Sequence, residues 1–114
     1  MPCIQLNTSV KLSDEKKTAI KSKLGKAIEW LPGKSENWLM ITMNDDMTIY
    51  FRGDNSAPAA FVMVGVYGRE DGRAFNALTA SICEILNQEL GISPDHVYVQ
   101  YAATQHWGWN GGNF

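Results

Sequence analysis

The chain is poor in cysteine and histidine, with two residues of each type among its 114. Cys3 and Cys83 form no CxxC pair, and His96 and His106 have no cysteine or acidic partners at the spacing of metal ligands. We therefore expect no metal site and no disulfide framework. Buried, reduced thiols are the simplest interpretation of the two cysteines, and this usage is typical of a cytoplasmic protein.

Long apolar runs and a charge bias are also missing. No segment approaches the roughly 18 apolar residues of a membrane span, and the polar residues Asn7-Thr8-Ser9 interrupt any signal-peptide core. The formal net charge of −2 gives no reason to expect a nucleic acid or an anionic membrane as a partner. The lysines between residues 16 and 26 are flanked by the acids Asp14, Glu15 and Glu29 and are best interpreted as a solvated helix face.

The first half of the chain predicts a strand, a helix and a second strand. The strand is expected at 3–8, and Ser13 followed by two acids is typical of a helix N-cap. The helix extends to Leu31 and stops at Pro32-Gly33, and the second strand follows at 38–43. An apolar stripe at helical spacing predicts the buried side of the helix. It consists of Ile20, Leu24, Ala27, Ile28 and Leu31.

The second half repeats this order after a turn and a short extended piece at 48–51. We expect a strand at 59–67, a helix from about Gly72 to Leu90 with Gly91 as its C-cap, and a last strand at 96–101. Two βαβ units predict an α/β (α+β) fold, a four-stranded sheet with both helices on one face. At 114 residues, with 45% hydrophobic content, the chain fits a single domain over 1–114.

Such a sheet would leave its other face bare. The strands at 39–43 and 60–66 are nearly continuously apolar, which is typical of strands covered on both faces. A chain this short has no residues left for a second layer. We therefore expect other copies of the chain to cover the sheet, most simply in a closed ring.

The last strand supplies candidate binding residues. Side chains alternate along a strand, so Tyr98 and Gln100 share one face while Val97 and Val99 share the other. Tyr98 and Gln100 can therefore line a pocket together with an adjacent first strand.

The tail at 105–114 contains three aromatic residues and three glycines, a composition that is unusual for a disordered tail. We interpret Trp109 as part of a hairpin packed for stability. Trp107 and Phe114 are better candidates for a ligand wall or a subunit contact.

The chain starts with Met1-Pro2, and an initiator methionine before a small residue is the usual substrate for excision. The mature chain would then begin with the secondary amine of Pro2. Burial or a neighbouring cation lowers the pKa of an amine, and a base whose pKa lies near the working pH suits general acid–base catalysis. Taken alone, this dipeptide favours a proline that only directs N-terminal processing.

Several short motifs occur in a characteristic order and spacing along the chain. They are Met1-Pro2, Leu6-Asn7-Thr8-Ser9-Val10, Gly33-Lys34, Ile92-Ser93-Pro94-Asp95-His96-Val97-Tyr98-Val99, and Gly108-Trp109-Asn110 with the final Phe114. Together they make the chain resemble the macrophage migration inhibitory factor family of the tautomerase superfamily over essentially its whole length. The resemblance implies a homotrimer with active sites at subunit interfaces, the N-terminal proline as base, and no cofactor.

The resemblance also implies roles for particular residues. Pro2 would move a proton between carbon and oxygen, exchanging the keto and enol forms of a small aromatic substrate such as an arylpyruvate. Lys34 would bind the substrate carboxylate or carbonyl and help to keep the prolyl amine neutral. Tyr98 would come from the neighbouring subunit. The other implied pocket positions are Trp38, Tyr67, Gln100, Trp107 and Phe114.

The chain departs from the animal members of this family at some of these positions. Tyr67 replaces an isoleucine and Gln100 an asparagine, so we expect a shifted substrate range. Ala59 and Val62 replace a CxxC pair, so we expect no thiol–disulfide activity.

Three functions remain open from the sequence. The first is a cofactor-independent isomerase of the phenylpyruvate tautomerase type, with dopachrome as another substrate of that chemistry. The second is a cytokine-like interaction protein with a vestigial pocket and a protein receptor, exported without a signal peptide. The third is a decarboxylase or dehalogenase, which usually requires arginines beside the proline. Of the three arginines in the chain, only Arg69 follows the predicted pocket edge at Tyr67-Gly68.

Overall fold

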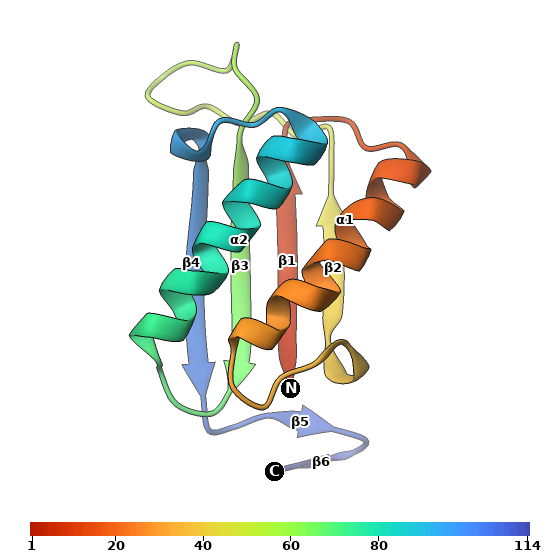
Figure 1. The fold of residues 1–114 in the computed structure, drawn as a ribbon, viewed down its shortest axis with the longest axis vertical. Coiled ribbons are helices and arrows are strands. Elements are labelled where there is room, and N and C mark those ends of the chain that lie inside the picture. The colour runs from red at the N-terminus through yellow and green to blue at the C-terminus, as the bar shows by residue number, and fades with distance from the viewer.

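A four-stranded sheet with both long helices packed on one face forms the body of the molecule in the computed structural model, which describes residues 1–114 (Figure 1). Two very short strands form a separate hairpin at the C-terminus. The elements are β1 (Pro2–Thr8), α1 (Asp14–Ala27), β2 (Met40–Asn44), β3 (Ala60–Tyr67), α2 (Gly72–Leu90), β4 (Val97–Thr104), β5 (Gly108–Trp109) and β6 (Gly112–Asn113).

The strand order β2-β1-β3-β4 confirms the two predicted βαβ units. β1 pairs in parallel with β2, and β3 pairs in parallel with β4. The two units meet where β1 and β3 run antiparallel, with Pro2 opposite Val66. This register places the start of the chain beside the end of β3.

The helix ends follow the signals in the sequence. The Ser13 side chain accepts a hydrogen bond from the Lys16 amide and caps α1, as predicted. Gly91 ends α2 with φ of 67°, a left-handed conformation that glycine adopts without strain. α2 also has an N-cap that was not predicted, because the Asp71 carboxylate accepts a hydrogen bond from the Ala74 amide.

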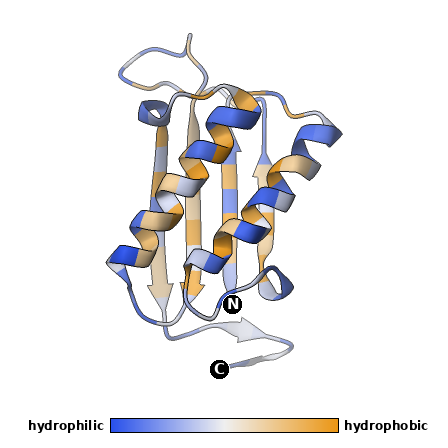
Figure 2. Cartoon of the chain, viewed as in Figure 1, coloured by the Kyte–Doolittle hydropathy of each residue, from blue (hydrophilic) through white to orange (hydrophobic).

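The core lies between the helices and the sheet. Apolar segments of both helices face the strands, while their outward surface is largely hydrophilic (Figure 2). The predicted stripe of α1 is buried in full, including Ile28 and Leu31, which lie beyond the last α-helical residue. Neither helix combines the length and apolar character that a membrane crossing needs.

The opposite side of the sheet, here called the open face, has no covering layer within the chain. Because side chains alternate along a strand, it carries the residues that are not buried under the helices. Met40, Phe61 and Tyr98 lie on it with 65%, 37% and 64% of their surface exposed. Large apolar side chains in such a position are typical of a protein interface. The prediction of a bare second face is thus confirmed for the single chain.

The extended piece expected at 48–51 contains no named strand, only an isolated bridge of Phe51 with Asp54. Three boundaries differ from those predicted. The α-helix of α1 ends at Ala27 and not at Leu31, and Ile28–Trp30 follows as a 3₁₀ turn. Trp38 is not in β2 but ends a short 3₁₀ turn, Glu36–Trp38. The last strand runs on to Thr104 because every residue of β3 finds a parallel partner in β4.

The 3₁₀ turn has a clear physical cause. The Leu39 amide donates to the Glu36 carbonyl, closing the turn before β2 begins. The Glu36 carboxylate pairs with Lys21 of α1 at 3.5 Å and packs over Gly25, where a Cβ would collide with it. This contact between turn and helix overrides the extended conformation that the apolar run 38–43 favours.

Candidate active site

The start of the chain lies in a confined place. Pro2 is buried at the first position of β1. The Met1 carbonyl accepts a hydrogen bond of 3.0 Å from the Tyr67 amide at the end of β3. With Met1 attached, the nitrogen of Pro2 is an amide. Burial, followed by the nearby charge of Lys34, lowers the pKa of the α-amine that ends the chain here.

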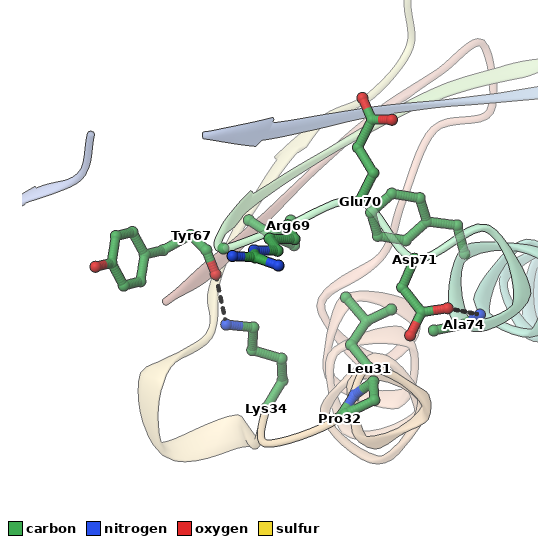
Figure 3. A pocket seen from close by; sticks show the side chains of 11 residues that line it. Leu31, Pro32, Lys34, Tyr67, Arg69, Glu70, Asp71 and Ala74 are labelled. Carbon is green, nitrogen blue, oxygen red and sulfur yellow. Dashed lines mark hydrogen bonds between the residues drawn. The ribbon is translucent and has the colours of Figure 1, made fainter. Parts of the chain in front are cut away.

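Lys34 lies in the loop between α1 and β2. Its ammonium donates a hydrogen bond of 2.8 Å to the Tyr67 carbonyl, as Figure 3 shows. The residue is partly buried, and this bond holds the cation beside the amine at the start of the chain. Two neighbouring positive charges repel each other, so the amine loses its proton at a lower pH than it would alone.

A row of aromatic rings extends from Tyr67 along the C-terminal hairpin. The Tyr67 and Phe114 ring centroids are 5.2 Å apart, those of Phe114 and Trp109 are 6.3 Å apart, and those of Trp109 and Trp38 are 5.3 Å apart. Trp38, Trp109 and Phe114 each keep about half of their surface exposed. The row therefore offers apolar ring surface next to the start of the chain.

Trp109 is the residue of this row that sequence reasoning left out, having assigned it only to a stabilising hairpin. The hairpin exists, but Trp109 stands between Trp38 and Phe114. Its placement follows from Asn110 and Gly111, both with positive φ, which form the tight turn typical of an Asn-Gly pair. That dipeptide was the signal that could have located Trp109 at the end of a strand facing the body.

Trp107 lies over the open face. Its ring is 3.9 Å from the place that a Cβ on Gly65 would occupy, so the absence of a side chain at Gly65 makes room for the indole. The Trp107 carbonyl also accepts a hydrogen bond of 3.0 Å from the Phe114 amide. Trp107 thus joins the tail to the sheet next to the aromatic row.

Tyr98 and Gln100 lie elsewhere on the same chain. Through the strand register, Tyr98 is level with Phe61 and Asn7, five residues along β1 from Pro2, or about 17 Å in the strand direction. The Tyr98 ring contacts Phe51 instead, with centroids 5.4 Å apart. Gln100 is level with Gln5 by the same register. Both side chains are exposed on the open face.

The predicted site residues therefore divide into two groups. Pro2, Lys34, Tyr67, Trp38, Trp107 and Phe114 gather around the start of the chain, whereas Tyr98 and Gln100 lie apart from them. Within one chain the first group brings together the start of β1, a cation and a row of aromatic rings. This geometry is compatible with a site whose remaining wall is supplied by the open face of another copy of the chain.

Comparison with known proteins supports a family assignment. A mixed four-stranded sheet of two βαβ units is the fold of the tautomerase superfamily. The family model "Macrophage migration inhibitory factor (MIF)" matches residues 1–114. The chain belongs to this family.

The relatives match over their full length. The macrophage migration inhibitory factor of Xenopus laevis is 28% identical over 116 aligned positions, covering 100% of this chain and 99% of the relative. The crystal structure of Leishmania major MIF2 superposes with a TM-score of 0.92 at 35% identity, covering 100% of this chain and 97% of the other. The homologue from Prochlorococcus marinus has a TM-score of 0.88 at 27% identity, with 98% of each chain covered.

Proposed function

We propose that the protein is a cofactor-independent keto–enol tautomerase that acts on arylpyruvates, with the amine of Pro2 as the base after removal of Met1. The observation that carries this proposal is the position of Lys34 beside the start of the chain, where burial and the lysine charge lower the pKa of the Met1 α-amine, and the same surroundings are expected to act on the Pro2 amine once Met1 is removed. A neutral amine near neutral pH is the state that can accept a proton.

The reaction needs one base and one cation. The neutral Pro2 nitrogen takes a proton from the carbon next to the substrate carbonyl, and the electron pair of that C–H bond moves to form the enolate. The prolyl ammonium then delivers the proton to the enolate oxygen, so that the enol leaves and the amine is regenerated. The Lys34 ammonium binds the substrate carboxylate or carbonyl and stabilises the negative charge that develops on oxygen.

The aromatic row supplies the binding surface for the substrate ring. Tyr67, Phe114, Trp109 and Trp38 present flat faces and edges that suit an aryl group. Tyr67 brings a hydroxyl to the edge of the site where the animal proteins have an aliphatic side chain. We expect it to narrow the site or to bond the ligand.

The proposal includes a homotrimer. The large apolar side chains on the open face and the distance between Pro2 and Tyr98 both favour a site that one chain cannot complete. In the trimer, Tyr98 and Gln100 of one copy would line the site of its neighbour. The longer amide of Gln100 then sets how closely the substrate approaches.

The direct test follows phenylpyruvate tautomerisation by absorbance, on protein shown by mass spectrometry to begin at Pro2. We expect enol–keto exchange well above the buffer rate and no release of halide from a haloacrylate, because Arg69 is the only arginine among the residues that line the cavity beside Lys34. The absence of tautomerisation in the processed trimer would contradict the proposal. Faster turnover of the haloacrylate would favour the dehalogenase interpretation instead.

Removal of the Lys34 charge should change the pH dependence. Lys34 lowers the pKa of the Met1 α-amine, and we expect its charge to do the same to the Pro2 amine of the processed protein. Lys34→Gln should therefore raise the pKa of that amine and move the acid limb of the kcat/KM profile to higher pH. Lys34→Arg keeps the charge and should leave the limb close to that of the wild type. The measurement is the pH profile of phenylpyruvate tautomerisation for the three proteins. An acid limb that does not move in Lys34→Gln would show that the lysine does not tune the base.

A further inference from the structure

A cavity of about 260 Å³ lies beside the group of residues around Pro2 (Figure 3). We call it the side cavity; it is formed where the loop after α1 meets the segment between β3 and α2. Lys34 and Tyr67 line it on one side, and Arg69 and Phe75 also contribute. Pro2 and the C-terminal aromatic residues are not among its lining residues. The Lys34–Tyr67 hydrogen bond therefore lies between the side cavity and the group of residues around Pro2.

The charged residues that line the side cavity are two cations, Lys34 and Arg69, and two acids, Glu70 and Asp71. Arg69 forms neither an ion pair nor a hydrogen bond within the chain. In Figure 3 its guanidinium points toward the side of the cavity where the Lys34 ammonium lies. Neither acid of the lining forms an ion pair with Lys34 or Arg69. The Asp71 carboxylate caps α2 by accepting from the Ala74 amide at 3.1 Å, and Glu70 points away from Lys34 and Leu31.

The remaining wall is apolar and rigid. It includes Leu31 and Val66, which belong to the core, and the ring of Phe75. Phe75 stacks on Tyr101 with ring centroids 4.3 Å apart and an interplanar angle of 11°. The Tyr101 hydroxyl also donates to the Phe75 carbonyl at 2.9 Å, so both the ring and the backbone of Phe75 are held in place.

We propose that the side cavity is a second binding site, separate from Pro2, for a small aromatic carboxylate. The planar guanidinium of Arg69 suits a carboxylate, which it can bind through two parallel hydrogen bonds, and Lys34 adds a second donor. The aryl group would lie against Leu31 and Phe75. The volume is near the lower end for ligand pockets, which restricts the ligand to about one ring and a short acid chain. The proposal does not depend on the tautomerase reaction.

The test is an NMR titration of the full-length, isotope-labelled protein with phenylacetate, which has the ring and the carboxylate but no keto group. We expect saturable shifts of the amides from Gly68 to Ala74. Arg69→Gln should weaken binding at least about tenfold, because it removes a charge-assisted hydrogen bond. Arg73→Gln is the matched control, since Arg73 is exposed on α2 and does not line the cavity. 2-Phenylethanol, which lacks the charge, should bind about as weakly to the wild type as phenylacetate binds to Arg69→Gln.

A Pro2→Gly variant separates this site from the candidate active site. Phenylacetate should still shift the amides from Gly68 to Ala74 in that variant, whether or not the protein is a tautomerase. Unchanged affinity in Arg69→Gln, or shifts that are confined to the start of the chain and lost in Pro2→Gly, would overturn the proposal. So would the lack of saturable binding to the wild type.

Discussion

Replacement of Pro2 by glycine is expected to lower kcat/KM for phenylpyruvate tautomerisation by about a hundredfold or more, the usual contribution of a positioned general base. Glycine leaves an amine at the start of β1, but a primary and flexible one. The strand pairing of β1 with β3, in which this position lies opposite Val66, keeps the strand in register. The loss should therefore come from the chemistry and not from the fold.

Two controls make this result decisive. The circular dichroism spectrum and sedimentation of Pro2→Gly should match those of the wild type. Wild-type protein that retains Met1 should be as inactive as the variant, because its Pro2 nitrogen is an amide. Activity in Pro2→Gly close to that of the wild type, or full activity in the protein that retains Met1, would show that the base is another group.

Met63→Asp is expected to dissociate the trimer and to abolish tautomerase activity without touching Pro2 or Lys34. Met63 stands in the middle of the open face, opposite Gln5 on one side and Gln100 on the other. In a closed ring the symmetry would bring three new carboxylates into a covered region, where each loses its hydration and repels the others. The measurement is sedimentation together with the phenylpyruvate assay at one protein concentration.

The matched control is Asn76→Asp, which adds the same charge at an exposed position of α2. It should remain trimeric and active. A monomeric Met63→Asp protein that retains activity would contradict the assignment of Tyr98 and Gln100 to the neighbour's site. A Met63→Asp protein that remains trimeric would show that the open face is not the covered surface.

Local signals predicted most of the fold because they act within a few residues. Ser13 and Gly91 end their helices through bonds to their own turns, and the alternation in β3 distinguishes its buried valines from Phe61 and Met63. Trp38 was misplaced for the opposite reason. Its turn depends on the contact of Glu36 with Lys21 and Gly25 in a distant helix, which no local pattern shows.

The candidate site shows the same division. Pro2 was singled out from the Met1-Pro2 start of the chain and gained its role through the family resemblance. Lys34 was predicted through the resemblance alone, since a lysine after the end of a helix is not unusual by itself. Trp109 was recognised as part of the site only in three dimensions, because its importance depends on Trp38 and Phe114. Arg69 was noted in the sequence beside the predicted pocket edge, but its place in the wall of the side cavity depends on the fold.

The two βαβ units, the helix caps and the apolar excess that points to a second layer could all be predicted from the sequence. Propensity, capping and alternation are properties of short segments, so they can be recognised without the fold. The hydrogen bond from the Lys34 ammonium to the Tyr67 carbonyl, beside the start of the chain, was visible only in the folded chain. The same holds for the distance of about 17 Å along the sheet between Tyr98 and Pro2 of the same chain. Both depend on the pairing of strands distant in sequence, since the register of β1 against β3 brings residues 2 and 66 together.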